Sequence, residues 1–369
     1  MATKRVLICS TPVGPLGSGV GGGVDLTLHG LVLGLGSLGH HVEVVAPAGS
    51  LHVGATVHQI PGAHQVSSQT QGRDTPISLP PSPVLGAMWE WARAHQYHFD
   101  VVLNLAYDWL PFYLSPFLDV PVAHLLSMGS LNDSMDAAIA SVITGRPGSV
   151  AVHSAAQAET FGPFADQLRV VGSGIALERY DLREAADDGV LGFVGRISAE
   201  KGIDDVFAVS EKTRKQVKVW GLMQDQSCWD AAWRRHPDAL VSYEGFLATD
   251  DLQAAIGGCA AILMTPKWVE AFGNVAIEAM ACGVPVIAYR RGGPSEIVVD
   301  GETGFLVEPD DIEGLIAAVA RIGQIDRAAC RARVEQYYST DALAARIDAW
   351  LDALVAHVDD DFADAFGCP

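Results

Sequence analysis

Basic residues, cysteines and long apolar runs are all scarce in this chain of 369 residues. It holds 24 Lys and Arg against 44 Asp and Glu, which gives a net charge of −20. A strongly acidic surface repels nucleic acid and anionic lipid, so a phosphate-bearing ligand would have to be held by a local pocket. We therefore expect no nucleic-acid partner and no stable membrane association.

The scarce cysteines form no CxxC pair, and the histidines show no metal-ligand spacing. Most cysteines lie in apolar contexts, which favours reduced, buried thiols over disulfides or zinc sites. No GxSxG motif of a serine hydrolase is present either. The first residues, MATKRVLICSTP, lead into a strand without an apolar stretch long enough for export or a membrane span, so we expect a cytoplasmic protein. The cysteines are Cys9, Cys228, Cys259, Cys282, Cys330 and Cys368.

The length suits two domains, each with its own core. A hydrophobic content of 49% with 38 glycines is typical of globular α/β proteins. Continuously apolar segments alternate with helical ones in the first half, which predicts a doubly wound parallel sheet. Its expected strands are Val6 to Ser10, Val42 to Ala46, Val101 to Leu105, Val122 to Leu126 and Val150 to His153.

The second half repeats this alternation and predicts a second Rossmann-like domain. Residues 50–83 are rich in Gly, Pro, Ser, Thr and Gln, which indicates an irregular loop, and the polar segment 177–189 is expected to be the linker. We thus expect domains at 1–180 and 190–340, followed by a closing helix and acidic tail at 341–369. The expected strands of the second domain lie at 190–194, 217–220, 241–243, 261–264 and 284–289, and the closing helix places Leu343, Ile347, Trp350, Leu351, Leu354 and Val358 on one face.

The segment WVEAFGNVAIEAMACGVPVIA carries two carboxylates, Glu270 and Glu278, on either side of a predicted helix start. Asn274 is a strong N-cap residue, so the backbone N–H groups that follow it would suit a phosphate. Carboxylates accept hydrogen bonds from sugar and ribose hydroxyls, so one segment could hold both ends of a sugar nucleotide. The alternative is a capped helix with solvent-facing glutamates.

A second polar motif, GFVGRISAEKG, ends a strand and places Arg196 and Lys201 five positions apart. Together these cations could neutralise a pyrophosphate while negative charge develops on it. The alternative is a pair of ordinary surface cations.

A GxGxxG pattern at Gly17, Gly19 and Gly22 follows the first strand. The pattern lies farther from the end of the strand than in a tight dinucleotide-binding turn. The second strand ends in Ala46-Pro47, where a ribose-binding acid would be expected. Both features argue against a dinucleotide site. Gly22 and Gly23 instead lead into a helix whose N-terminus would favour donor phosphates.

His124 lies on the strand VPVAHLLS, near the carboxyl end, where open α/β sheets place functional groups. It is either a functional group or a hydrogen-bonded structural histidine. His40 and His41 at a helix-to-strand turn are expected to be structural.

Taken together, EAFGNVAIEAMACGVPVIAYRRGGPSEIVVDGETGFLV resembles the donor-site signature of the family 4 retaining glycosyltransferases. The resemblance extends to GRISAEKG, YEGF at 243–246, the glycine-rich first loop and LGHHVEVVAP, so it covers nearly the whole chain. It implies the GT-B fold, in which two Rossmann-like lobes face each other across a cleft and a C-terminal helix crosses back. The lobe 1–180 would bind the acceptor, and the lobe 190–340 the nucleotide sugar.

The resemblance also implies roles for individual residues and a reaction without metal or cofactor, since the DxD at Asp359 and Asp361 lies in the tail. Retention would come from same-face attack in which the departing phosphate oxygen helps to take the acceptor's proton. Two departures from the family pattern are Gly172-Ser173-Gly174 in place of an Asn-Gly turn, and Trp268 before Glu270. By this resemblance, Glu270 would hold the donor sugar and Glu278 the ribose, while Arg196 and Lys201 would hold the diphosphate. The donor pocket would be lined by Phe272, Gly273, Asn274 and Val275. His124 would lie beside the reaction centre.

The acceptor is expected to be a soluble small molecule, because the first lobe shows no basic amphipathic helix. Its opening and compact length are also similar to the bacterial pterin glucosyltransferases, which transfer glucose from UDP-glucose to tetrahydrobiopterin. Tyr107, Asp108 and Trp109 are the predicted acceptor-side residues. The alternatives are a transferase for another sugar or a cell-envelope acceptor, a sugar-nucleotide epimerase, and a non-catalytic nucleotide-sugar-binding protein.

Overall fold

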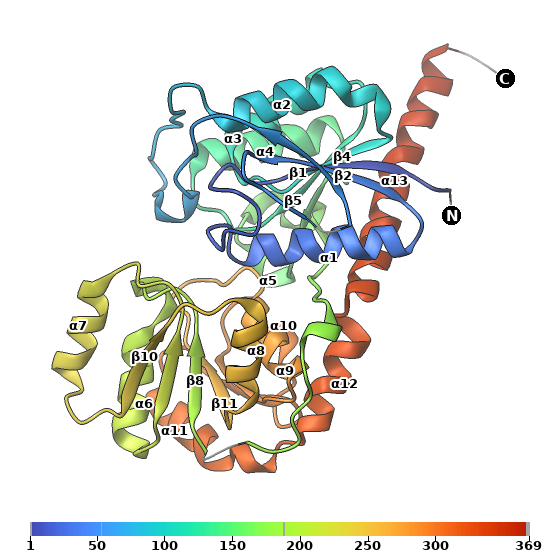
Figure 1. Cartoon of the computed structure of the whole chain (residues 1–369). Coiled ribbons are helices and arrows are strands. Elements are labelled where there is room, and N and C mark those ends of the chain that lie inside the picture. The colour runs from blue at the N-terminus through green and yellow to red at the C-terminus, as the bar shows by residue number, and fades with distance from the viewer. Residues whose placement is uncertain (1, 53, 187–188, 367–369) are drawn as a thin grey trace. The chain divides into compact units, whose positions relative to one another are not determined.

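The chain folds into two compact units, Met1–Ser173 with Thr340–Pro369, and Gly174–Ser339 (Figure 1). The computed structural model describes residues 2–52, 54–186 and 189–366. Cys368 and the rest of the predicted tail at 367–369 lie outside the described residues, as does the side chain of Val358. Each unit is built around its own parallel sheet, as the alternation of apolar strands and helices predicts.

The first unit contains a seven-stranded parallel sheet of order β3-β2-β1-β4-β5-β6-β7. The five predicted strands are confirmed, and two more were not predicted. The edge strand β3 lies inside the segment expected to be irregular, and β7 is an exposed two-residue strand. Neither has the continuous apolar run that marks a buried parallel strand. The strands are β1 Arg5–Cys9, β2 His41–Pro47, β3 Thr56–Ile60, β4 Val101–Asn104, β5 Val122–Leu126, β6 Val150–Val152 and β7 Arg169–Val170.

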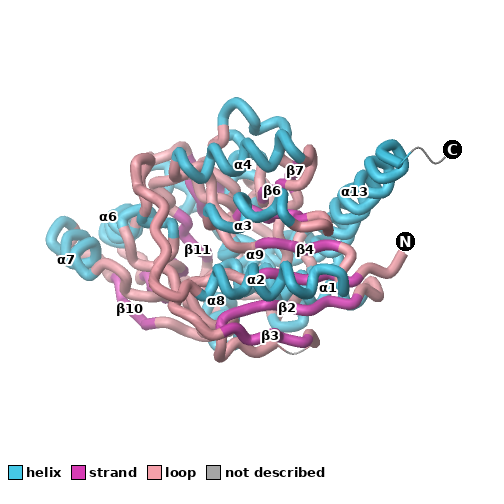
Figure 2. The backbone as a smooth tube through the Cα atoms, turned by 90° about the horizontal axis from the view of Figure 1, so that it is seen from above, coloured by secondary structure: helices cyan, strands magenta, loops and turns pink. Residues whose placement is uncertain are grey.

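Helices connect most of these strands (Figure 2). Side-chain caps fix several of the helix starts. Asn132 accepts from the N–H groups of Ser134 and Met135, which satisfies two donors at the start of α4. The helices are α1 Gly23–Ser37, α2 Val84–His95, α3 Trp109–Leu114, α4 Asp133–Gly145, α5 Ala155–Glu159 and α13 Thr340–Phe366, with short 3-10 turns at Ser68–Thr70, Gln96–His98, Ser115–Phe117 and Gly162–Gln167.

The closing helix α13 packs against α1 in the first unit (Figure 1). Its predicted apolar face is buried from Leu343 to Leu354, and the helix extends to Phe366, through most of the segment expected to be a frayed tail. A buried ion pair joins Lys4 Nζ to Asp348 Oδ1 at 2.7 Å, and His40 Nε2 lies 3.0 Å from the same oxygen. Apolar burial and paired charges therefore attach α13 to the start of the chain.

The second unit contains a six-stranded parallel sheet of order β10-β9-β8-β11-β12-β13. All five predicted strands are confirmed, and the edge strand β13 was not predicted. The strands are β8 Leu191–Val194, β9 Val217–Trp220, β10 Val241–Gly245, β11 Ala261–Met264, β12 Val286–Tyr289 and β13 Gly304–Val307. The helices are α6 Ile203–Thr213, α7 Gln226–Arg235, α8 Thr249–Gly257, α9 Asn274–Ala281, α10 Pro294–Ile297, α11 Ile312–Arg321 and α12 Arg327–Tyr337, with 3-10 turns at Leu177–Arg179, Ala199–Lys201 and Ile322–Gln324.

The two units divide between Ser173 and Gly174, before the polar segment 177–189. Tyr180 in that segment is buried in the core of the second unit. The Gly172-Ser173 turn belongs to the first unit, where Arg346 Nη2 donates to the Ser173 carbonyl at 3.1 Å. Part of the segment 177–189 therefore packs into the second unit.

Each sheet has one point where the strand order reverses, between β1 and β4 in the first and between β8 and β11 in the second. In open α/β sheets the loops beyond the carboxyl ends of these strand pairs diverge and leave a crevice for ligands.

Two further observations concern membrane-spanning helices and the cysteines. Among the described residues, no helix is both long and apolar enough to cross a membrane. The described cysteines are free thiols, and all but Cys228 are buried.

Candidate functional site

Lys201 and Glu270 form an ion pair at the reversal point of the second sheet. Lys201 lies in the loop after β8, and Glu270 in the loop after β11, so the pair joins the two loops that follow the strands at the reversal point. Both side chains are largely buried, with exposed fractions of 21% and 15%. The structure thus brings together two residues that the sequence separates by 69 positions.

Two side-chain acceptors hold the guanidinium of Arg196. Its Nη1 donates to Gln224 Oε1 at 2.5 Å, and its Nη2 lies 3.1 Å from Glu200 Oε1. Glu200 also accepts from the Ser198 hydroxyl at 2.7 Å, so the loop after β8 fixes the guanidinium. In this structure a ligand phosphate would therefore share Arg196 with Glu200.

The charge state of Glu270 follows from its neighbours. Burial alone would raise the pKa of this carboxyl, but the positive charge of Lys201, hydrogen bonds from Lys201 and Trp268, and the charge of Arg196 together hold the pKa below its ordinary value. Glu270 is therefore ionised at neutral pH and can accept hydrogen bonds.

Close backbone contacts fix the loop that carries Glu270. Gly292 has φ 75°, and a Cβ atom there would lie 2.4 Å from the Glu270 carbonyl oxygen. The N–H of Gly293 donates to that same carbonyl at 2.7 Å, and a Cβ at Gly293 would lie 2.2 Å from the Phe272 carbonyl oxygen. Only glycines at both positions permit this approach of the loop after β12 to residues 270–272.

The start of α9 differs from the prediction by one residue. Gly273, with φ 96°, occupies the N-cap position, and Asn274 is the first helical residue instead of the cap. Glycine supplies the left-handed conformation here without a side-chain cap. Val275 follows on the first turn, and Phe272, which was expected to line the donor pocket, is buried in the core and contacts Tyr338 edge to face.

Glu278 is buried inside α9, with an exposed fraction of 4%, which contradicts the alternative of a solvent-facing glutamate. Its Oε1 accepts from the Tyr180 hydroxyl at 3.0 Å. Burial raises the pKa of Glu278 to about 7, despite the hydrogen bond from Tyr180 and the charge of Arg179. Tyr180 is a partner that the sequence did not reveal, because it lies 98 positions away in the segment expected to be a linker.

The glycine loop of the first unit surrounds a carboxylate. Gly22 is the N-cap of α1, and Asp25 lies in the first turn, where its Oδ2 accepts from the N–H of Gly17 at 3.4 Å. A Cβ at Gly21 would lie 2.1 Å from Asp25 Oδ1. Burial raises the pKa of Asp25 to about 6. A carboxylate in this turn opposes phosphate binding, so the N-terminus of α1 beyond Gly23 is a poorer phosphate site than the sequence indicated.

His124 has no solvent exposure and lies in the middle of β5, not at its end. Its Nδ1 lies 3.1 Å from Asn104 Nδ2, its Nε2 lies 2.7 Å from Ser115 Oγ, and its ring stacks on Phe112. Burial lowers the pKa of His124 to about 3, so the ring is neutral. This geometry corresponds to the structural alternative.

Replacing His124 with alanine should lower the free energy of unfolding by about 2–4 kcal/mol, because a cavity forms and two buried polar partners lose a hydrogen bond. The affinity for the nucleotide sugar that the resemblance implies should stay within about twofold of the wild type, because a structural histidine makes no ligand contact. Urea unfolding and calorimetry measure the two quantities, with His98→Ala at an exposed position as the control. Full stability combined with a loss of turnover would restore the catalytic interpretation.

The predicted acceptor-side residues follow β4, at the reversal point of the first sheet. Tyr107 is buried and donates to the Gly129 carbonyl at 3.0 Å. Asp108 caps α3 through Leu110 N–H and accepts from Gln65 Nε2 at 2.9 Å. Trp109 is partly exposed and stacks on Tyr113, with ring centres 4.5 Å apart. The aromatic pair presents more surface to a ligand than Tyr107 does.

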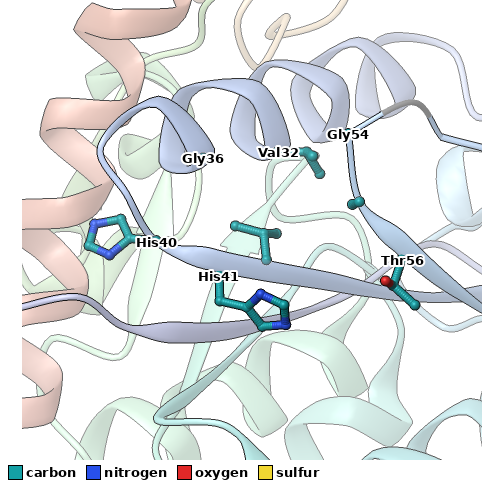
Figure 3. Close-up of a pocket in the computed structure, with 8 residues that line it drawn as sticks. Val32, Gly36, His40, His41, Gly54 and Thr56 are labelled. Carbon is teal, nitrogen blue, oxygen red and sulfur yellow. The ribbon is translucent and has the colours of Figure 1, made fainter.

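A hollow of about 350 Å³ lies elsewhere on the first unit (Figure 3). It lies beside the N-terminal ends of β2 and β3, whereas the glycine loop follows the C-terminal end of β1. The hollow therefore does not belong to the predicted site. Its lining residues are Val32, Gly36, His40, His41, Val42, Gly54, Ala55 and Thr56.

In residues 2–52, 54–186 and 189–366, no group of three or more His, Cys, Asp or Glu is arranged to hold a metal, and a metal-free reaction stays a prediction.

Solved glycosyltransferase structures share the architecture of the whole chain. The avilamycin biosynthesis glycosyltransferase AviGT4 superposes with a TM-score of 0.72 at 19% identity and covers 96% of this chain and 98% of its own. Anabaena Alr3699/HepE in complex with UDP-glucose gives a TM-score of 0.70 at 17% identity, covering 95% and 100%. The protein thus has the GT-B fold, which confirms the predicted fold class.

The family match covers nearly all of the second unit. Residues 175–340 match the family described as glycosyl transferases group 1. Glycogen synthase of Mycobacterium tuberculosis is 31% identical over 176 residues, which are 44% of this chain and 42% of that protein. D-inositol 3-phosphate glycosyltransferase of Saccharomonospora viridis is 31% identical over 182 residues, 42% of each chain. The alignments thus cover less than half the length of these curated relatives.

Proposed function

We propose that the protein is a retaining, metal-independent glycosyltransferase of the cytoplasm. It would transfer a hexose, glucose from UDP-glucose, to the hydroxyl of a soluble small molecule, for which tetrahydrobiopterin is our first choice. The observation that carries the proposal is the Lys201–Glu270 pair at the reversal point between β8 and β11, within the segment that matches glycosyl transferases group 1.

The chemistry of the pair suits a nucleotide sugar. The ionised Glu270 accepts hydrogen bonds from the hydroxyls of the donor sugar, which carry no charge of their own. Lys201 and Arg196, in the loop after β8, would neutralise the diphosphate as the glycosidic bond breaks. The amides at the start of α9, around Asn274 and Val275, would add hydrogen-bond donors for a phosphate.

The proposal assigns the ribose of the donor to Glu278 and the acceptor to the first unit. Glu278 would accept the ribose hydroxyls through an oxygen that Tyr180 does not already occupy. Tyr107, Asp108 and Trp109 would lie on the acceptor side. Support for the donor comes from Alr3699/HepE, which shares the fold and was solved with UDP and with UDP-glucose.

The proposal is tested by incubating the protein with UDP-glucose and a panel of reduced pterins, sugars and lipids, and by reading UDP release and product mass. We expect UDP release that depends on a reduced pterin, without added metal. Release with other sugars or lipid acceptors but not with pterins would overturn the acceptor assignment. Binding of UDP-glucose without UDP release by any acceptor would favour the non-catalytic alternative.

A further inference from the structure

Trp268 contacts both members of the Lys201–Glu270 pair. Its Nε1 donates to Glu270 Oε2 at 3.1 Å, and Lys201 Nζ lies 5.2 Å from the centre of the indole ring. Lys201 also donates to that same Oε2. The indole therefore contacts both side chains, through a hydrogen bond to the Glu270 carboxylate and through cation–π attraction to the Lys201 ammonium group.

Both donors converge on one oxygen of the carboxylate. Across the described part of the chain, no residue donates a hydrogen bond to the other oxygen, Oε1 of Glu270. A carboxylate offers about four acceptor sites, so Oε1 retains its capacity for a ligand. Trp268 and Lys201 thus determine which oxygen of Glu270 is available.

Contacts of the two preceding residues fix the loop that carries Trp268. Arg291 Nη1 donates to the Pro266 carbonyl at 2.8 Å, and the N–H of Lys267 donates to the Glu200 carbonyl at 2.8 Å. Lys267 Nζ in turn pairs with Asp205 and lies 2.7 Å from Asp310 Oδ1. Trp268 therefore follows two residues that are held by contacts to four other segments, which carry Arg291, Glu200, Asp205 and Asp310.

We propose that Trp268 is a positioning and specificity residue for the donor sugar, which holds the carboxylate of Glu270 so that Oε1 receives a sugar hydroxyl. The inference rests on the proposed function, because it assigns the sugar part of a nucleotide sugar to Glu270. An acceptor-only oxygen selects a hydroxyl at that position, and the nucleotide makes no use of it. Loss of the indole N–H should therefore weaken recognition of the sugar and leave recognition of the nucleotide intact.

The test compares Trp268→Phe with wild-type protein, using UDP and UDP-glucose as separate ligands in calorimetry. Phenylalanine keeps a ring beside Lys201 and removes the N–H. We expect UDP affinity within about twofold of the wild type and a loss of about 10-fold for UDP-glucose, in the range for one hydrogen bond to a charged group. The matched control is Trp233→Phe, which removes an indole N–H from a partly buried tryptophan packed on Phe207, remote in sequence from both loops.

The pH profile provides a readout that a merely structural role would not change. Removing a donor to the ionised Glu270 raises its pKa, so the acidic limb of the kcat/KM profile should move to higher pH in Trp268→Phe and stay in place in Trp233→Phe. Thermal unfolding verifies that each variant is folded.

The outcomes separate the inference from the proposed function. If wild-type protein binds neither UDP nor UDP-glucose, the proposed function fails. If it binds both and Trp268→Phe loses UDP and UDP-glucose affinity equally, or loses neither, the positioning role is wrong. A selective loss for UDP-glucose with a shifted acidic limb supports it.

Discussion

Glutamine in place of Glu270 should lower kcat/KM for UDP-glucose by about 100-fold while UDP affinity stays within about threefold of the wild type. The substitution keeps the size of the side chain but removes the negative charge that pairs with Lys201. A neutral amide also presents N–H donors to Lys201 or to the sugar, where an acceptor is needed. The ion pair with Lys201 and the acceptor that the proposed function assigns to the donor sugar are thus lost at once.

Steady-state kinetics with saturating acceptor and calorimetry with UDP measure the two effects. Glu313→Gln, an exposed position on α11, is the control for the same chemical change outside the site and should retain wild-type values. Thermal unfolding is needed beside the kinetics, because Lys201 loses its partner in a largely buried position. A folded Glu270→Gln protein with full turnover would remove the central claim of the proposed function.

Most of the strands that were predicted correctly share one property, a continuous apolar run that is buried, and β10, with only Val241 buried, is the exception. Ala261–Met264 and Val122–Leu126 are of this kind, and their bounds agree with the sequence. The strand Thr56–Ile60 was missed because it is an edge strand with partly exposed residues on both faces, between segments rich in Gly and Pro. Such a strand lacks the apolar signal by which buried parallel strands are recognised.

Candidate site residues could be recognised in the sequence from their residue type and motif. The side chains that they contact depend on the order of the strands in the sheet. Lys201 meets Glu270 only because β8 lies beside β11 in the sheet, and sequence periodicity carries no information on that neighbour relation. The same holds for Tyr180 and Glu278. His124 shows the converse, since its sequence context permits a functional or a structural role, and only the packing of Phe112, Asn104 and Ser115 around it favours the structural one.

Burial of Glu278 makes the stability of the protein depend on pH in a defined direction. Burial raises its pKa to about 7 in the folded state, above the ordinary value of 4.5 for an exposed glutamate. The folded state therefore binds a proton that the unfolded state has released, and the free energy of unfolding falls as pH rises from about 4.5 through about 7. The pKa difference corresponds to about 3 kcal/mol, lost in full above pH 7.

Glu278→Gln should abolish this loss, because a buried amide carries no charge and its oxygen can still accept from the Tyr180 hydroxyl. We expect equal stability of the two proteins near pH 4.5 and a variant that is more stable by up to about 3 kcal/mol at pH 8. Urea unfolding at both pH values measures the difference, and Glu302→Gln on an exposed turn should follow the wild type. Parallel pH dependence of Glu278→Gln and wild type would show that another group carries the proton.

The same substitution separates a structural glutamate from a ribose ligand. A ribose hydroxyl that donates to Glu278 stabilises the ionised carboxylate, so wild-type protein should bind UDP more tightly as pH rises through 7. Glu278→Gln should lack this gain and bind UDP about 10-fold more weakly than wild type at pH 8, with little difference at pH 5, where both side chains are neutral. Higher stability together with unchanged UDP affinity at pH 8 would leave Glu278 as a buried acid with no part in nucleotide binding.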